Sequence, residues 1–505
     1  MYTILIRKFL VLAAVSLCFA QCKEKILQID PTIPISTVDN YYKNETEAVA
    51  AINAAYSPLT AIYNGAAWHL ADIMSDDADL GGGGGGDGLE TAELDNFSVT
   101  SFNPIINIMW AQCYYGILRC NLVVEKVPLV PAISIVLKNK CVGEAKFLRA
   151  LYYYHLVRLF GDVPLYTKII TAEESSTIFR SSKAKVYEQI IADCKEAEML
   201  LPPINVSASK GRATAGAAKG LLASVYLWLG DKTNAAAKAK EIIDNSATYG
   251  YELWADYEDN FKLENENGKE SLFEVQYRSG NGQYTDYGPG QKLNTFFGPR
   301  AQDIVPSTGY GWNVPTKDFV DSYEKSSTTY ASITDKRRTS TIWIPGDMYG
   351  TYTQAAQLVG SPNGFNVRKY FIPVANLSGD NGGWASAQNI PIMRYAEILL
   401  IYAEAAGPAM GKQYADQVRA RAGLAALPTA LSEADYLTAI YKERRLEFGF
   451  EMHRWYDLLR HPNPNYFLDV MRAAGKTNIQ AKHRYMPIPQ SDRDKNANLT
   501  QNEGY

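Results

Sequence analysis

A pair of short helices joined by a Gly-Asp turn is the segment that most constrains the fold of this chain. Residues 214–229 read TAGAAKGLLASVYLWL, Gly230-Asp231 follow, and residues 233–244 contain the run AAAKAKEII. Ala217 and Ala223 are small residues at positions where two helices approach closely. Because such a pair buries its apolar face only against neighbouring pairs, several pairs are expected to stack.

The pattern of this pair is tetratricopeptide-like, and other segments have a helical periodicity of their own. These segments cover the residues from 46 onward, 107–126, 144–160, 182–201, 391–406 and 435–460. Ser182 is an expected N-cap, and Pro202-Pro203 is an expected terminator. We therefore predict an all-α fold: a tetratricopeptide-like helical-repeat scaffold with long irregular loops and a few short strands.

The composition of the sequence changes between residues 259 and 390, where Gly, Pro, Asn, Thr and aromatic residues dominate. Short pieces such as Leu272–Tyr277 have the character of strands. Irregular regions of this length usually carry function, and the aromatic content argues against disorder. We expect one compact domain with a helical region at 46–258, this loop-rich region at 259–390 and a second helical region at 391–505.

The first 22 residues have the features of an export signal. Residues 1–21 carry a basic head and then the apolar run 9–20, which is too short to cross a bilayer. Cys22 stands where a bacterial lipoprotein signal is cut and lipidated, although Gln21 replaces the usual small residue. The alternative is an ordinary secretory signal with an incidental cysteine. We expect residues 1–21 to be removed, Cys22 to be lipidated and residues 22–45 to form a tether.

The charge balance argues against nucleic acid as a partner. The formal net charge is −4, and no basic excess is available to neutralise phosphates. Tyrosine is unusually frequent, with 34 Tyr against 17 Phe and 8 Trp. Tyrosine suits both hydrated binding surfaces and packed helical repeats, so its frequency does not decide between a binding role and a packing role. Buried free thiols are expected at Cys113, Cys120, Cys141 and Cys194.

Seven stretches of the chain carry motifs of a known family, in that family's order. They include EAKFLRALYYYHLVRLFGDVPLY at 144–166, NIPIMRYAEILLIYAEAA at 389–406 and ERRLEFGFEMHRWYDLLR at 443–460, with others at 185–202, 268–277, 417–424 and 486–505. On these residues the chain resembles the SusD/RagB family of outer-membrane nutrient-uptake lipoproteins. Glu503 departs from the pattern, because a proline is expected there.

The resemblance implies a tetratricopeptide-like fold whose long loops bind the ligand. It implies a lipid anchor on Cys22 that holds the protein on the outer face of a Gram-negative outer membrane, in a Bacteroidetes species. It also implies a partner, a SusC-like TonB-dependent transporter, which the protein caps as a hinged lid. In that role the protein captures an oligosaccharide and releases it into the transporter without cleaving it.

The sequence lacks a catalytic constellation. The motifs HExxH and G-x-S-x-G are absent, and the five histidines have no metal-ligand spacing. Glu443, Glu447 and Glu451 share a helical face, but Arg444 and Arg454 each lie three residues from one of them. Structural ion pairs are therefore expected, because a glycosidase needs two carboxyls facing each other across a cleft. We predict a protein that is not an enzyme and has no cofactor.

The loop Ser75–Glu90 is the sharpest local feature. Its four aspartates, Asp76, Asp77, Asp79 and Asp87, flank six glycines, Gly81–Gly86. Glycine lets the backbone approach a ligand closely, and carboxylates accept hydrogen bonds from sugar hydroxyls. Three interpretations stay open: a flexible surface loop, a sugar-binding loop as the resemblance implies, and a calcium loop without an EF-hand pattern.

Aromatic residues are the other candidates for ligand contact. They are Tyr284, Tyr287, Phe296, Phe297, Tyr310, Trp312 and Trp384 in the loop-rich region, with Trp68 just before the Asp/Gly loop. Aromatic rings stack on the C–H faces of sugars, although each ring alone is also explained by loop packing. We nominate as ligand-binding residues Trp68, Asp76, Asp77, Tyr284, Tyr287 and Trp312. Two alternatives keep the fold: peptide ligands, or a scaffold that binds only a protein partner.

Overall fold

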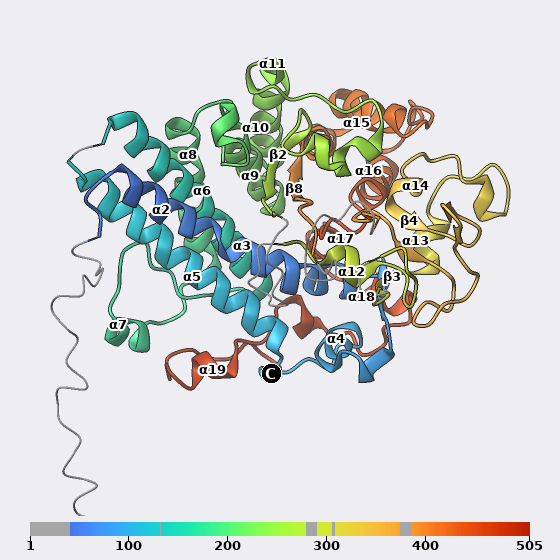
Figure 1. Ribbon diagram of the computed structural model, residues 1–505, viewed down its shortest axis with the longest axis horizontal. Helices are drawn as coiled ribbons and strands as arrows, with labels where there is room; N and C mark the ends of the chain where they lie inside the picture. Colours follow the sequence, from blue (N-terminus) through green and yellow to red (C-terminus); the bar gives the residue numbers. More distant parts are fainter. Residues whose placement is uncertain (1–40, 132, 279–289, 306–308, 374–384) are drawn as a thin grey trace, which may run out of the picture.

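The long helices of the chain pack in sequence order. The computed structural model describes residues 41–131, 133–278, 290–305, 309–373 and 385–505. Its long helices are α2 (Glu45–Tyr56), α5 (Pro104–Lys126), α6 (Ile135–Phe160), α8 (Lys183–Leu200), α9 (Ala215–Trp228), α10 (Lys232–Asp244), α15 (Tyr395–Arg421) and α16 (Glu433–Glu447). From α5 to α10 each long helix contacts the next, and α15 packs on both α10 and α16 (Figure 1). The predicted stack of helix pairs is confirmed.

Small side chains let these helices approach closely. Ala217 and Ala223 of α9 are fully buried. Gly116 of α5 lies against the ring of Tyr152 on α6, where an added Cβ would sit 2.2 Å from the ring. The four cysteines expected as buried free thiols are confirmed as such: Cys113, Cys120, Cys141 and Cys194.

Shorter helices connect the long ones and occupy much of the right-hand side of Figure 1. The α-helices are α3 (Pro58–Ala61), α4 (Leu89–Asp95), α7 (Ala172–Thr177), α11 (Ser246–Tyr249), α12 (Leu293–Phe297), α13 (Lys317–Asp321), α14 (Arg338–Thr341), α17 (Arg454–Leu459), α18 (Tyr466–Ala473) and α19 (Gln490–Arg493). Two π-helical turns, η2 (Ile62–Ala66) and η3 (His69–Ile73), follow α3. The 3-10 turns are η4 (Gly84–Gly86), η5 (Val127–Leu129), η6 (Ser207–Ser209), η7 (Tyr257–Phe261), η8 (Leu263–Asn265), η10 (Tyr330–Ser332) and η12 (Ala481–Arg484). Among the described residues, none of the helices combines the length and the hydropathy needed to span a bilayer.

The strands are short and form antiparallel pairs. The pairs are β1 (Ala78–Gly81) with β3 (Trp312–Pro315), β2 (Ser271–Val275) with β8 (Ile390–Arg394), β4 (Ile342–Trp343) with β7 (Asn366–Val367), and β5 (Met348–Tyr349) with β6 (Tyr352–Thr353). Pro391–Arg394, predicted to begin a helix, instead belong to β8, and α15 begins at Tyr395. The helical prediction was wrong there because the backbone of this segment pairs with β2, a contact between residues that are distant in sequence.

The helix predicted over residues 435–460 is interrupted in the structure. It is two helices, because α16 ends at Glu447 and α17 begins at Arg454. Between them Phe450 and Met452 adopt left-handed backbone conformations, with φ of +61° and +66°. Non-glycine residues rarely adopt the left-handed conformation, and the residue types at these positions give no sign of it. Helical periodicity therefore could not reveal the break.

A buried ionic cluster fastens the loop-rich region to the C-terminal helices. The Arg394 guanidinium donates to Glu270 at 2.7 Å, to Glu447 at 2.8 Å and to Glu451 at 2.7 Å. From the loop-rich region, Arg337 donates to Glu443 at 2.6 Å. The prediction that Glu443, Glu447 and Glu451 form structural ion pairs is confirmed, although Glu451 lies beyond the end of α16.

The partners of these glutamates, however, differ from the local arginines that the spacing indicates. Arg444 pairs with Asp457 at 3.0 Å, and Arg454 pairs with Asp76 at 2.7 Å. Because α16 ends before Glu451, the three-residue spacing across the break no longer brings Arg454 next to Glu451. Each buried charge is instead satisfied by a residue from another segment.

Candidate ligand-binding site

Four aromatic rings from three segments meet in one cluster, which we call the aromatic platform: Trp68, Phe296, Tyr310 and Trp312. The ring centroid of Trp312 lies 5.1 Å from that of Phe296, 5.0 Å from that of Tyr310 and 6.3 Å from that of Trp68. Trp68 and Phe296 are buried, whereas Tyr310 and Trp312 are partly exposed. The two outer rings, Tyr310 and Trp312, are therefore the part of the platform that a ligand can reach.

Strand pairing places Trp312 beside the glycine loop. β1 and β3 are antiparallel, with Gly81 opposite Trp312. The next residue, Gly82, has a φ of +58°, and an added Cβ would lie 2.4 Å from Cδ1 of Trp312. Glycine is required here because a side chain would be strained and would collide with the indole. At Gly81 and Gly82 the loop is thus fixed against the platform rather than free.

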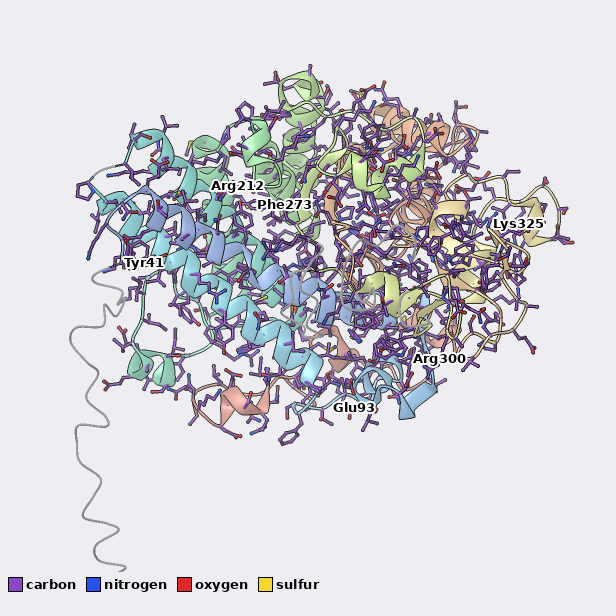
Figure 2. All side chains as sticks on the ribbon, viewed as in Figure 1. Tyr41, Glu93, Arg212, Phe273, Arg300 and Lys325 are labelled. Atoms are coloured by element: carbon purple, nitrogen blue, oxygen red, sulfur yellow. The ribbon has the colours of Figure 1, made fainter. Side chains whose placement is uncertain are left out.

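Asp87 supplies a charged group beside the outer rings. Its Oδ2 accepts hydrogen bonds from Trp312 Nε1 at 3.4 Å and from the Gly83 N–H at 3.0 Å, and it also pairs with Arg300. The hydrogen bond from Arg300 holds the pKa of the Asp87 carboxyl below its ordinary value. The Asp87 and Arg300 side chains are 31% and 28% exposed. Figure 2 labels Arg300 at the lower right of the molecule.

This arrangement has the chemistry of a sugar site. Exposed rings offer a flat apolar surface for the C–H face of a sugar, and a few polar groups beside them fix orientation. The Asp87 carboxylate accepts hydrogen bonds from hydroxyls, while the Arg300 guanidinium donates to ring or hydroxyl oxygens. The two opposite charges sit together, so the site has no strong preference for an ionised ligand.

Trp68 belongs to the platform but does not reach its surface. Its indole is fully buried, stacks on His69 with centroids 3.4 Å apart, and donates from Nε1 to the Asn64 carbonyl at 3.0 Å. The expectation that Trp68 contacts a ligand directly is therefore corrected. It supports Trp312 from behind, because a ring enclosed on all sides cannot stack on a sugar.

The nominated aspartates Asp76 and Asp77 are anchors rather than free acceptors. Arg454 binds Asp76 through two hydrogen bonds of 2.7 and 2.8 Å, and Arg445 binds Asp77 at 2.6 Å. Both aspartates are at most 3% exposed. The nomination of these two residues as ligand contacts is corrected, since their carboxylates are buried and paired with arginines. Their effect is to tie the start of the loop to α16 and α17.

The aspartates of the loop do not converge on a single point. Asp79 faces Lys476 at 3.7 Å, and Asp87 pairs with Arg300. No group of three or more His, Cys, Asp or Glu side chains within the described residues is arranged to hold a metal ion. The calcium interpretation of the loop thus finds no ligand set in this part of the chain.

Three aromatic candidates, Tyr284, Tyr287 and Trp384, lie outside the described residues. Of the remaining candidates, Phe296 and Tyr310 stack on each other with centroids 5.9 Å apart, and Phe297 is buried against Trp68. Arg300 is a site residue that sequence reasoning missed. The one hint in the sequence was that Arg300 closely follows the Phe296-Phe297 pair. A single arginine in a Gly-Pro-Arg turn belongs to no motif, so the sequence did not mark it as a ligand contact.

The fold and the site together define a helical-repeat protein with a loop-built binding site. Residues 269–505 match the model of the SusD family, and residues 83–227 match a family described as starch-binding and associating with the outer membrane. A SusD-like protein P2 of Formosa agariphila is 32% identical, covering 94% of this chain and 95% of that protein. The chain therefore belongs to the SusD family, which consists of non-catalytic carbohydrate-binding proteins associated with the outer membrane.

Solved structures agree with this assignment. A laminarin-binding SusD-like protein superposes with a TM-score of 0.79 at 30% identity, covering 92% of this chain and 100% of that one. Surface glycan-binding protein A from Bacteroides thetaiotaomicron, in complex with laminarihexaose, superposes with a TM-score of 0.76 at 26% identity, covering 91% of this chain and 99% of that one. The matches span the helices and the loop-rich region alike.

Proposed function

We propose that this protein binds oligosaccharides at the cell surface and delivers them to a SusC-like TonB-dependent transporter. The proposal of sugar binding rests on one observation: two partly exposed rings, Tyr310 and Trp312, lie beside the Asp87–Arg300 ion pair. A sugar stacks on the rings while the two charged groups fix its hydroxyls. The lipid on Cys22 holds this modest binder beside a transporter mouth, where the effective concentration of captured sugar is high.

A β-glucan of the laminarin type is the first ligand to test, because two structural relatives are named for laminarin or laminarihexaose. The full mature chain is titrated with laminarihexaose by isothermal calorimetry. Replacing Trp312 or Tyr310 by Ala should lower the affinity about tenfold, equal to ~1.4 kcal/mol. Trp254→Ala is the matched control, because Trp254 is also a half-buried tryptophan but lies against Lys269, away from the platform.

A glycan array run beside peptide pools separates the alternatives. Binding to any glycan that depends on Trp312 supports the proposal, even when the glycan is not laminarin. Binding to peptides alone would replace the ligand class. Absence of any small ligand, with a protein partner still recovered, would favour the protein-only scaffold.

The delivery half is tested in the membrane. A tagged full-length chain is purified from outer membranes in mild detergent, and a TonB-dependent barrel should be recovered with it. Cys22→Ala should lose incorporation of labelled palmitate and reduce recovery of the barrel. Equal labelling of the Cys22→Ala variant would contradict the lipid anchor.

A further inference from the structure

Asp72 is a buried carboxylate that contacts two backbone segments of unusual conformation. It lies in η3 and is 2% exposed. Its Oδ1 accepts a hydrogen bond from the Met452 N–H at 3.1 Å, and its Oδ2 accepts one from Asn313 Nδ2 at 3.1 Å. Both partners are left-handed, with φ of +66° at Met452 and +57° at Asn313. Because residues with a side chain adopt this region at a cost, the two hydrogen bonds help to hold both segments in place.

Asn313 links this carboxylate to the aromatic platform. It directly follows Trp312 in β3, and it is fully buried. Its Nδ2 donates to Asp72, while its Oδ1 has no hydrogen-bond partner within the described part of the chain. A buried amide with an unused oxygen has a second orientation available, in which the oxygen faces Asp72. That orientation becomes favourable only when Asp72 carries a proton to donate.

The surroundings of Asp72 bring its titration close to neutral pH. Burial raises the pKa of the Asp72 carboxyl to about 7, and the hydrogen bond from Asn313 opposes this rise. The charged and titratable groups that act on the carboxyl come from three neighbouring segments: Asp77 after η3, Lys369 and Tyr370 after β7, and Tyr456 on α17. Lys369 is the cation among these groups, but its ammonium donates to Glu451 at 2.7 Å.

We propose that Asp72 is a positioning residue for Trp312, acting through the side-chain amide of Asn313, and that protonation of Asp72 re-orients the indole. The ionised carboxylate accepts from Asn313 and Met452 at once. After protonation, one carboxyl oxygen becomes a donor and opposes the Asn313 N–H. The amide then turns over so that its free oxygen accepts from Asp72. Because this hydrogen bond helps to hold Asn313 in its left-handed conformation, changing it lets the backbone of Asn313 adjust, and the indole of the adjoining Trp312 shifts with that backbone. Since Trp312 is an outer ring of the proposed sugar site, ligand affinity falls on the acid side of this transition, a consequence that rests on the proposed function.

A fluorine label on the indole tests the link without any ligand. The full chain is produced with 5-fluorotryptophan, and the Trp312 resonance is assigned by its loss in Trp312→Phe. In the wild-type protein this resonance should move through one transition with a midpoint near pH 7, following the pKa of about 7 for Asp72. In Asp72→Asn it should stay at one position throughout, because the amide cannot titrate.

Two further variants test whether the transition depends on Asp72 and Asn313. Asn313→Gly keeps the left-handed backbone, which glycine adopts freely, and removes the amide, so it too should abolish the transition. Glu266→Gln is the matched control: burial raises the pKa of Glu266 to about 7 as well, but Glu266 accepts from the Asn389 N–H at 2.7 Å and does not contact the platform. This variant should keep the transition. A transition that survives in both Asp72→Asn and Asn313→Gly would assign it to Asp77 or Lys369 and overturn the proposal.

Ligand titration gives the functional readout. The affinity of the wild-type chain for laminarihexaose should fall about threefold between pH 8 and pH 5.5, and the affinity of Asp72→Asn should be flat over that range. An equal pH dependence in both proteins would overturn the functional consequence. Failure of the wild-type chain to bind any glycan would refute the proposed function, whereas the fluorine experiment would still decide the role of Asp72.

Discussion

Trp312 and Asp87 lie 225 residues apart in the sequence and are joined by a hydrogen bond of 3.4 Å from the indole nitrogen to the carboxylate. The contact unites the glycine loop with the loop-rich region. It depends on the β1–β3 pairing, which places Gly81 opposite Trp312 and leaves the carboxylate at the side of the ring. The stacking surface and the polar group that orients a ligand are thus built from segments that are far apart in the sequence.

Gly82→Ala should displace Trp312 and lower glycan affinity by about tenfold or more, ~1.4 kcal/mol. The added methyl would lie 2.4 Å from the indole at a left-handed residue. Gly84→Ala is the control, because Gly84 is also left-handed but an added Cβ meets nothing within 4 Å. It should cost about 1–2 kcal/mol of stability and leave affinity unchanged. Calorimetric titration and thermal unfolding of both variants provide the comparison; equal loss of affinity would contradict the packing argument.

Asp87→Asn should weaken glycan binding by a similar factor at pH 5.5 and at pH 8. Because Arg300 holds the pKa of Asp87 below its ordinary value, the carboxylate is ionised at both pH values. Asp79→Asn, which alters an exposed aspartate on β1, should bind like the wild type. A loss in Asp87→Asn that appeared only at pH 8 would show that Asp87 titrates in this range and would contradict the prediction.

Arg394→Met should destabilise the protein by about 3–5 kcal/mol, because it removes the cation that three buried carboxylates share and leaves them with fewer cations than these carboxylates need. Arg394 is 2% exposed and pairs with Glu270, Glu447 and Glu451. Chemical denaturation measures the loss. Lys168→Met removes a lysine of the exposed pair with Glu174 and should leave the unfolding midpoint where it is. Equal midpoints for the wild type and Arg394→Met would rule out a stabilising role for the cluster.

The free energy of unfolding should be highest near pH 4 and should decline on both sides of it. Arginines hold the pKa of Glu447 at about 2, below the unfolded value of 4.5, so the stability this group contributes is lost as pH falls from about 4.5 toward 2. Burial raises the pKa of Asp72 from 3.8 to about 7, so its contribution is complete below about pH 4 and is lost as pH rises through 7. Denaturant titrations from pH 2.5 to 8.5 measure the balance. In Asp72→Asn the decline toward pH 8 should be shallower.

The helical scaffold was largely predictable because its signals are local. Periodicity, caps and alanines located the pairs around Thr214–Leu229, and family motifs placed the C-terminal helices. The predictions failed at Pro391–Arg394 and at Glu447–Arg454, where a distant strand and two left-handed residues decide the local structure. Both failures arise from contacts between segments, which a periodicity within one segment does not contain.

The candidate site was predictable in part. Trp312 and the glycine loop were nominated from residue chemistry, since aromatic rings and small residues are what a sugar site requires, and the structure brings the two together. Trp68, Asp76 and Asp77 have the same chemistry but are buried, one behind the platform and two against arginines. Residue type shows what a side chain can do, but its exposure depends on which other segments cover it.

Taken by itself, the sequence determined the helical class of the fold, predicted an export signal followed by a cysteine, and indicated the two segments from which the candidate site is built. Only the tertiary structure decided that these segments meet, that Asp87 and Arg300 form the polar edge of the platform, and that Asp72 accepts a hydrogen bond from Asn313, the residue next to Trp312. The physical reason is that helices depend on contacts within a few residues, whereas the site depends on hydrogen bonds and stacking between residues more than two hundred positions apart.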